Sequence, residues 1–347
     1  MKKYKVGIIG AGNIAQSAHL PVYRKLADRA EVVAIADTNL ARAQDAAKAF
    51  DIPKAYNSVE ELLASSDVDF VDICVWNNSH APAAIAAAKA GKPILCEKPM
   101  SDSLAHSLEM ESEVKKAGVP FMMAMVFRFS AESTLLHQMT EAGELGDIYY
   151  AKTGYIRRRG TPIGWFTDMS KSGGGPVIDI GVHCIDVTWF LMGRPKPTRV
   201  SAAVSYAIGN FKTKGISRWT ALDPGSGVFD TEDSASAIIH FENGASMLVE
   251  VSWALNADGS HYTQICGSKG GAILEPFTVF TENNLGYLAD HHPIVPKVNR
   301  FEEEIAHFID CLDTGNKPIS PIEDGIAIQR MLAGIYDSAR LGKEVVI

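Results

Sequence analysis

Short apolar runs alternate with amphipathic stretches along the first 125 residues. The runs are rich in β-branched residues and nearly continuous, as in strands that are buried on both faces of a parallel sheet. The expected strands are Tyr4–Ile9, Glu31–Ala36, Asp69–Val75, Pro93–Cys96 and Val119–Met125. The stretches between them predict helices, with Gly91 and Gly118 at two helix ends: Leu40–Phe50, Ala81–Ala90 and Leu104–Ala117. This alternation predicts an α/β domain over residues 1–125, built on a doubly wound parallel sheet.

The pattern changes after residue 125, where longer segments alternate between apolar and polar residues. They predict strands, and the Asn243-Gly244 step between the last two is typical of a hairpin turn: Asp147–Arg157, Thr198–Tyr206, Ser234–Phe241 and Ala245–Trp253. Helices are expected over Val177–Met192, Phe301–Leu312 and Ile326–Leu341. The second domain, over residues 126–347, is therefore expected to be α+β with a large, mostly antiparallel open sheet. Its C-terminal helices could pack back on the first domain.

Composition and charge narrow the function classes. The 347 residues carry 33 Lys and Arg against 41 Asp and Glu, and this net charge of −8 argues against a nucleic-acid-binding protein. The apolar run after Met1-Lys2-Lys3 is too short for a signal peptide, and no run is long enough for a transmembrane helix. The five cysteines form no CxxC pair, which is typical of reduced thiols in a cytoplasmic protein.

A glycine-rich segment follows the first strand and opens a helix. Gly10-Ala11-Gly12-Asn13-Ile14-Ala15 matches G-x-G-x-x-G/A, in which the first glycine makes a tight turn and the second leaves room for a pyrophosphate. A glycine turn without a ligand also fits this motif. Asp37 ends the second strand, where a carboxylate binds the ribose hydroxyls of NAD and repels the 2′-phosphate of NADP. Asp37 could instead cap the helix from Leu40. The combination favours a Rossmann domain that binds NAD through Gly10, Gly12, Asn13, Ile14 and Asp37.

Two further segments end strands on the same side of the expected sheet. Trp76-Asn77-Asn78-Ser79-His80 offers Trp76, Asn77 and His80 to the cofactor, although Asn78 or Ser79 could simply cap the next helix. In Glu97-Lys98-Pro99, the proline stiffens the backbone where the chain leaves the sheet and holds Lys98 at the cleft. An ordinary surface lysine is the alternative interpretation.

Together with Gly173-Gly174-Gly175, Asp179 and His183, these motifs follow the order seen in a known family. The chain resembles the Gfo/Idh/MocA oxidoreductases over essentially its whole length. The resemblance implies NAD(P)-dependent oxidation of a secondary alcohol on a sugar or cyclitol, or the reverse reduction, by a homodimer or homotetramer assembled through the C-terminal sheet. One departure is Val75-Trp76, which stands where many members carry Thr-Pro.

Three residues are candidates for the chemistry. Pro176 favours a helix start after the glycines, so Asp179 and His183, four residues apart, are expected on one helix face. The resemblance implies that His183 is the acid/base, that Lys98 stabilises the developing alkoxide, and that Asp179 orients the substrate hydroxyl. Asp179 could instead stabilise the helix dipole and His183 could be a core histidine, while Asp186 is expected to have a supporting role.

The substrate-binding residues are less well defined. Arg128 precedes Phe129 in a step common in the family, and Tyr155, Trp165 and Trp253 could line a sugar pocket. A core aromatic or an exposed sheet arginine is an equally good interpretation of each. The Arg157-Arg158-Arg159 run invites an anionic substrate, but strand alternation would point its members to opposite faces.

No metal is expected, because neither the Asp179, His183 and Asp186 set nor the His291-His292 pair has a strong ligand spacing. Two alternatives to a dehydrogenase stay open. One is an NAD-dependent glycosidase that oxidises C3 transiently, and the other is a non-catalytic dinucleotide sensor. The intact Lys98, Asp179 and His183 set argues against the sensor.

Overall fold

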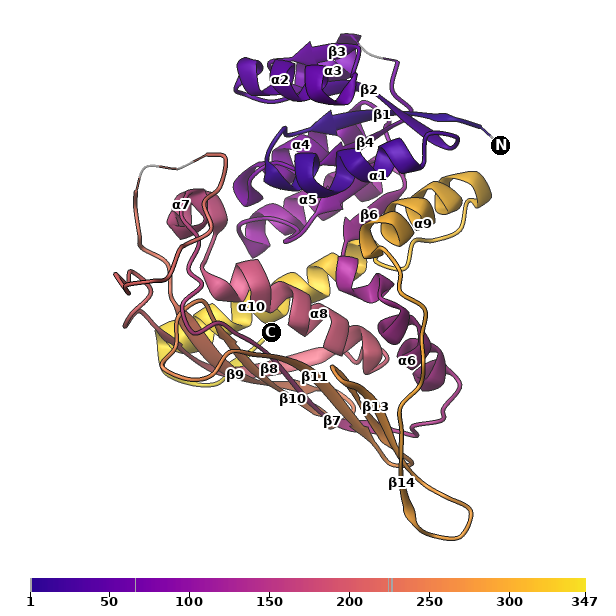
Figure 1. Ribbon diagram of the computed structural model, residues 1–347, viewed down its shortest axis with the longest axis vertical. Helices are drawn as coiled ribbons and strands as arrows, with labels where there is room; N and C mark the ends of the chain where they lie inside the picture. The colour runs from indigo at the N-terminus through magenta and orange to yellow at the C-terminus, as the bar shows by residue number, and fades with distance from the viewer. Residues whose placement is uncertain (1, 66, 224, 226) are drawn as a thin grey trace. The chain divides into compact units, whose positions relative to one another are not determined.

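A computed structural model describes residues 2–65, 67–223, 225 and 227–347 of the chain (Figure 1). The chain forms two compact units. The first comprises Met1–Met125 and Asn299–Gln329, and the second comprises Val126–Val298 and Arg330–Ile347. The sequence interpretation placed 126–347 in one domain, with the option that C-terminal helices join the first. In the structure, the 299–329 segment belongs to the first unit.

The first unit contains a six-stranded parallel sheet in the order β3-β2-β1-β4-β5-β6. The strand order reverses between β1 and β4, and ligands of such sheets bind at the carboxyl ends of the strands at this point. The predicted strands are confirmed, whereas the short β3 was not predicted. The strands are β1 (Tyr4–Ile9), β2 (Ala30–Ala36), β3 (Lys54–Tyr56), β4 (Phe70–Ile73), β5 (Ile94–Glu97) and β6 (Phe121–Ala124).

Helices connect these strands. Two of them, α2 and α5, begin and end as predicted, because Asn39 and Ser103 cap their N-termini and Asp51 and Gly118 end them with positive φ. The helices are α1 (Leu20–Lys25), α2 (Leu40–Phe50), α3 (Val59–Ser65), α4 (Asn77–Lys89), α5 (Leu104–Ala117) and α9 (Arg300–Thr314), and a π turn over Ala15–His19 precedes α1. Helix α10 (Ile322–Leu341) begins in this unit and ends in the second.

The second unit contains a nine-stranded sheet in the order β14-β13-β12-β11-β7-β10-β9-β8-β15. Only β10 and β7 pair in parallel among its described strands; the other pairs are antiparallel. The class of fold is as predicted, but strands β11 to β15 were not predicted. The strands are β7 (Ile148–Ile156), β8 (Pro197–Ser205), β9 (Ser234–Phe241), β10 (Ser246–Ser252), β11 (Ser260–Gly267), β12 (Gly271–Leu274), β13 (Phe277–Glu282), β14 (Leu288–His291) and β15 (Val345–Val346).

The hairpin between β9 and β10 turns where predicted. Gly244 has a φ of 86° and donates its N–H to the Phe241 carbonyl, while the Asn243 side chain accepts the Ala245 N–H. Positive φ at this position is what the glycine supplies.

A central helical segment packs on β7 and β11. The predicted helix over 177–192 is present but starts as a π turn, Val177–Gly181, and continues as α8 (Val182–Leu191). Before it come a 3₁₀ turn over Val126–Phe129, helix α6 (Ala131–Glu141), a 3₁₀ turn over Trp165–Thr167, and helix α7 (Met169–Ser172). Nearly every residue of α8 is buried, so this helix forms the core between the sheet and the rest of the unit.

Within the described ranges, none of the helices combines the length and the apolar character needed to cross a bilayer. All five cysteines are free thiols, and four of them are buried.

Candidate functional site

The glycine turn after β1 contains two glycines with different surroundings, Gly10 and Gly12. Gly10 has a φ of 102°, and a Cβ there would lie 2.6 Å from the Cys74 carbonyl oxygen, so the fold itself requires glycine. A Cβ at Gly12 would meet only that same oxygen, at 3.8 Å. The space beside Gly12 is therefore open, and Asn13 and Ile14 border it half-exposed. This open turn at a helix N-terminus fits the pyrophosphate of a dinucleotide.

Asp37 closes the turn from the end of β2. Its Oδ2 accepts the Ala11 N–H at 2.9 Å, and its Oδ1 accepts the Asn39 N–H at 2.8 Å. The cap of helix α2 is Asn39, whose Oδ1 accepts the Arg42 N–H at 3.2 Å. The alternative interpretation of Asp37 as this cap is therefore wrong. The Asp37 carboxylate stands at the glycine turn, with the Arg42 guanidinium 3.9 Å away.

The segment from Trp76 is a helix start rather than a loop. Trp76 is the N-terminal cap residue of α4 and makes no side-chain capping bond, so Asn78 and Ser79 lie within the first turn. The suggestion that one of them caps the helix is wrong. Asn77 opens the helix and is buried.

His80 ties the start of α4 to the lysine turn. It is 1% exposed, and its ring nitrogens lie 2.6 Å from the Pro99 carbonyl oxygen and 3.1 Å from that of Val75. Burial lowers the pKa of His80. These contacts give His80 a role in holding the Lys98–Pro99 turn, whose peptide bond is cis.

Glu97 connects this turn to a buried ionic network. Its Oε2 accepts the Lys98 N–H at 3.0 Å, and its Oε1 lies 3.0 Å from Nε2 of His19. The other ring nitrogen of His19 lies 2.7 Å from Asp72 Oδ2. Burial by itself would lower the pKa of His19, but the charge and hydrogen bond of Asp72, together with the interactions of Cys74, outweigh burial and hold this pKa well above its usual value. An imidazolium between two carboxylates thus fixes Glu97 beside Lys98.

The same network is the one group of metal-ligand type found in the described part of the chain. Candidate ligand atoms of His19, Asp72 and Cys74 lie within 4.8 Å of one another. They are already hydrogen-bonded, since the Cys74 thiol donates to Asp72 at 3.6 Å and His19 contacts Asp72. Burial raises the pKa of Cys74 to about 12, so it remains a thiol rather than the thiolate that binds metals.

The second unit holds Asp179 and His183 on consecutive helical turns. Asp179 lies in the π turn and His183 in the first turn of α8. The Asp179 Oδ2 accepts the indole N–H of Trp253 at 3.0 Å. Trp253 is fully buried, so it supports Asp179 and has no free face for a sugar.

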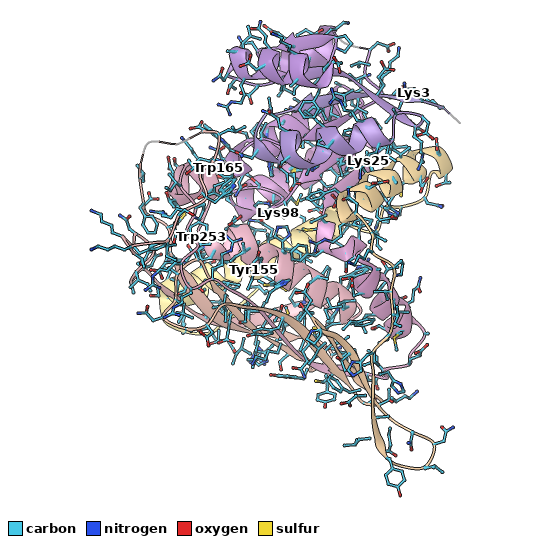
Figure 2. The ribbon with its side chains drawn as sticks, viewed as in Figure 1. Lys3, Lys25, Lys98, Tyr155, Trp165 and Trp253 are labelled. Atoms are coloured by element: carbon cyan, nitrogen blue, oxygen red, sulfur yellow. The ribbon has the colours of Figure 1, made fainter. Side chains whose placement is uncertain are left out.

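An aromatic row extends from His183 to a predicted substrate residue. The His183 ring stacks on Phe127 with 4.6 Å between centroids, Phe127 lies 5.6 Å from His261, and His261 lies 4.7 Å from Tyr155. Tyr155 projects from β7 on the side where α8 packs (Figure 2). Phe127 and His261 were not predicted. Phe127 directly precedes the Arg128-Phe129 step that the sequence pointed to, whereas His261 lies on an unpredicted strand.

Arg128 is part of the core of the second unit. It is 1% exposed, its Nη2 lies 2.6 Å from Asp186 Oδ1, and its guanidinium lies 4.7 Å from the Phe190 ring centroid. Arg128 and Asp186 therefore join the 3₁₀ turn to α8, and the buried guanidinium has a structural role there. Trp165 is half-buried and stacks on Phe166 at 4.1 Å.

The Arg157–Arg159 run does not converge on one point. Arg157 lies over the Tyr155 ring, whereas Arg159 bonds to Asn256 and to the Leu255 carbonyl oxygen.

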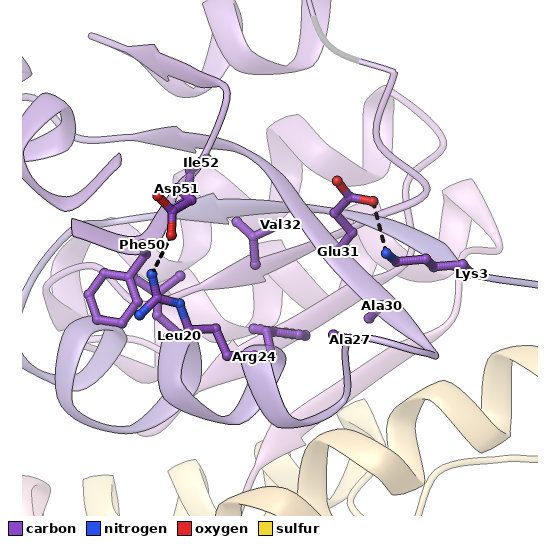
Figure 3. A pocket seen from close by; sticks show the side chains of 11 residues that line it. Lys3, Leu20, Arg24, Ala27, Ala30, Glu31, Val32, Phe50, Asp51 and Ile52 are labelled. Atoms are coloured by element: carbon purple, nitrogen blue, oxygen red, sulfur yellow. Dashed lines mark hydrogen bonds and ion pairs between the residues drawn. The ribbon is translucent and has the colours of Figure 1, made fainter. Parts of the chain in front are cut away.

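A cavity of about 180 Å³ lies elsewhere in the first unit (Figure 3). It adjoins Ala30 and Val32 at the amino end of β2, whereas Asp37 follows the carboxyl end of that strand. Ion pairs join Arg24 to Asp51 and Lys3 to Glu31 at its rim. The cavity is therefore distinct from the glycine turn.

Comparisons with known proteins identify the family of this chain. A family model described as an oxidoreductase family with an NAD-binding Rossmann fold matches residues 4–125, and the GFO/IDH/MocA C-terminal domain matches residues 134–273. The chain is 32% identical over 346 residues to D-glucoside 3-dehydrogenase of Escherichia coli K12, with 98% of this chain and 97% of that protein covered. It is 29% identical to trans-1,2-dihydrobenzene-1,2-diol dehydrogenase of Bos taurus, with 96% and 95% covered.

Among solved structures, levoglucosan dehydrogenase in complex with NADH matches with a TM-score of 0.85 at 23% identity, covering 100% of this chain and 99% of that chain. This likeness shows the fold. The fold and the matched families define an NAD(P)-dependent dehydrogenase with an NAD-binding Rossmann domain. The chain belongs to the Gfo/Idh/MocA oxidoreductase family, as its motifs predicted.

Proposed function

We propose that this protein moves a hydride between NAD and a ring carbon that carries a secondary hydroxyl, in a sugar, a sugar derivative or an inositol. The observation that carries the proposal is the full-length likeness to an enzyme named for oxidising a glucoside at position 3. The name of the second relative denotes a ring diol. Both names denote hydroxylated ring compounds as the substrates of those relatives.

The chain's own residues have distinct roles in this reaction. His183 takes the hydroxyl proton as a general base, because imidazole titrates near neutrality. Lys98 donates a hydrogen bond to the oxygen on which negative charge develops. Asp179, held by the Trp253 indole, orients the substrate hydroxyl. A bound nicotinamide would supply the hydride acceptor for the ring carbon.

NAD is proposed as the preferred dinucleotide. The Asp37 carboxylate stands at the glycine turn, where it would bind ribose hydroxyls and repel a 2′-phosphate. Arg42 lies 3.9 Å from Asp37, so its charge is directed to that carboxylate.

We also propose a homodimer or homotetramer formed through the sheet of the second unit. Side chains such as Tyr149 and Ile238 are exposed on β7 and β9 (59% and 39%), which supports an interface there. The free cysteines support a reducing, cytoplasmic location.

The test is a spectrophotometric screen of the full chain with NAD and, separately, NADP. The panel contains inositols, aldoses, ketoses, sugar acids and aryl glycosides. NADH that appears with one ring-polyol class, and that is lost in His183→Ala, supports the proposal. Cleavage of aryl glycosides without NADH accumulation would instead favour the glycosidase. NADH binding without any turnover would favour the sensor and contradict the proposal.

A further inference from the structure

Glu232 is a buried carboxylate with three donors. It is 0% exposed, its Oε2 accepts the Gly175 N–H at 2.9 Å, and its Oε1 accepts the Val177 N–H at 3.1 Å. Oε1 also accepts the Tyr336 hydroxyl at 2.9 Å. All three donors are suited to a carboxylate, which accepts hydrogen bonds on both oxygens.

This carboxylate supplies a cap that the local sequence lacks. The π turn over Val177–Gly181 has Pro176 as its N-terminal cap residue, and Pro176 has no side-chain cap bond. The first N–H groups of a helix need an acceptor from elsewhere. Glu232 provides it from a segment more than fifty residues later in the chain.

The two glycines before the π turn pack so closely against Glu232 and Tyr336 that neither has space for a side chain. A Cβ at Gly174 would collide with the Tyr336 hydroxyl, and a Cβ at Gly175 would collide with the Glu232 carbonyl oxygen. The backbone of the glycine turn, Glu232 and Tyr336 are therefore packed as one unit.

The anchored turn is the one that carries the catalytic pair. Asp179 lies two residues after Val177 in the same π turn, and His183 follows in the first turn of α8. Trp253, which bonds to Asp179, also donates its backbone N–H to the Asp233 carbonyl oxygen at 2.9 Å. The 232–233 segment thus contacts the π turn at its beginning and supports the residue that fixes Asp179 (Trp253 is labelled in Figure 2).

We propose that Glu232 is a positioning residue for Asp179 and His183, acting through the N–H groups of Gly175 and Val177. The inference rests on the proposed function in assigning catalysis to Asp179 and His183. A displacement of about 1 Å at a reacting group can cost about 10²-fold in rate, so an anchor of this kind controls turnover without touching the substrate.

Asp233 offers a matched control. It is adjacent to Glu232, equally buried, and likewise accepts two backbone N–H groups. The donors to its side chain are the N–H groups of Ile208 and Gly209 and the Ser234 hydroxyl, which lie outside the π turn. Asp233 contacts Trp253 through its backbone carbonyl, which Asp233→Asn leaves unchanged. Glu232→Gln and Asp233→Asn therefore make the same chemical change in the same core, but only Glu232→Gln alters a side chain that bonds to the π turn.

The first experiment measures kcat and NADH affinity for both variants of the full chain. The glutamine amide cannot accept a hydrogen bond at its NH₂ group, so at least one of the three donors loses its acceptor. We expect kcat of Glu232→Gln to fall by about 10²-fold while the Kd for NADH is unchanged. Asp233→Asn should keep wild-type kcat. Wild-type kcat in Glu232→Gln, or equal losses in the two variants, would overturn the proposal.

The second experiment does not need turnover. The indole N–H resonance of Trp253, assigned with Trp253→Phe, reports the position of Asp179 in ¹H–¹⁵N NMR spectra. It should move in Glu232→Gln and stay in place in Asp233→Asn; an unmoved resonance in both would overturn the positioning role. If the wild-type chain shows no turnover, the proposed function fails and this resonance alone decides the inference. If Glu232→Gln does not fold, Tyr336→Phe removes one donor and must still move the resonance.

Discussion

Two helix starts in this protein, one in each unit, share a design. Gly10–His19 and Gly173–His183 both pass from a glycine turn through a π turn into an α-helix. π turns of this kind are frequent at functional sites. In each case a carboxylate from a remote strand region accepts backbone N–H groups of the turn: Asp37 in the first unit and Glu232 in the second.

The difference between them lies in what fills the turn. A Cβ at Gly12 would meet only a distant carbonyl oxygen, whereas Cβ atoms at Gly174 and Gly175 would collide with neighbours. The first turn is open to a ligand, and the second is closed by the protein itself. The open turn has space for a ligand, whereas the closed turn can only hold the residues that follow it in place. Substitutions in each turn test these two roles.

The largest effect is expected at the closed turn. His183→Ala should lower kcat by about 10²–10⁴-fold because the proposed general base is lost, with NADH affinity unchanged. Steady-state kinetics and a fluorescence titration with NADH measure the two quantities. His240→Ala, which changes a half-buried histidine of β9, is the control and should keep wild-type turnover. Near-normal kcat in His183→Ala would show that His183 is not the general base.

The two glycines of the open turn should respond differently. Gly10→Ala puts a Cβ at positive φ against the Cys74 carbonyl group and should lower the unfolding free energy by about 3 kcal/mol. Gly12→Ala should keep the stability but raise the Kd for NADH about 10-fold, since only the ligand needs that space. Urea unfolding and NADH titration separate the outcomes. Equal losses of stability would show that the turn is not open.

Asp37→Ala tests the carboxylate of the open turn. Loss of charged hydrogen bonds to the ribose should raise the Kd for NAD by about 10–100-fold and relax the discrimination against NADP. Asp45→Ala, on the exposed side of α2, is the control. An unchanged ratio of NAD to NADP affinity would show that Asp37 only binds the backbone of the turn and does not select the dinucleotide.

A smaller, pH-dependent effect is expected from His19 at the end of the first π turn. Its pKa is raised in the folded state, so its contribution to stability is complete below the unfolded pKa near 6.5 and is lost as the pH rises toward the folded pKa. The unfolding free energy should therefore fall by up to about 1.4 kcal/mol per pH unit from this group as the pH rises above about 6.5. His19→Gln should remove this component. Identical slopes in denaturant unfolding of both proteins would contradict a charged His19.

The sequence predicted elements whose ends are set locally. Helix α2 was predicted to the residue because Asn39 caps it and Asp51 adopts positive φ directly after it. Helix α4 was placed four residues too late, since Pro82 is typical of a first helical turn but here lies inside the helix. Strand β14 exposes most of its residues, so it has no alternation to recognise.

Only the site residues that belong to short sequence motifs could be predicted. The glycine turn, Asp37 and Lys98 follow strands, and a strand end can be predicted. The partners of Glu232 and Asp186 are set by tertiary packing over 50 residues or more, so no spacing pattern revealed them. For the same reason, Arg128 was expected at the substrate although its guanidinium is committed to Asp186.

One pair of hydrogen bonds determines when the first unit can finish folding during synthesis. Met123, in the last strand of the first sheet, donates its N–H to the Ser320 carbonyl group at 2.8 Å, and the Ser320 hydroxyl donates back at 2.6 Å across 197 residues of chain. Strand β6 therefore leaves the ribosome long before its partner has been translated. The dinucleotide-binding unit, although it begins at the N-terminus, is not complete until strands β7 to β14 of the second sheet have been translated.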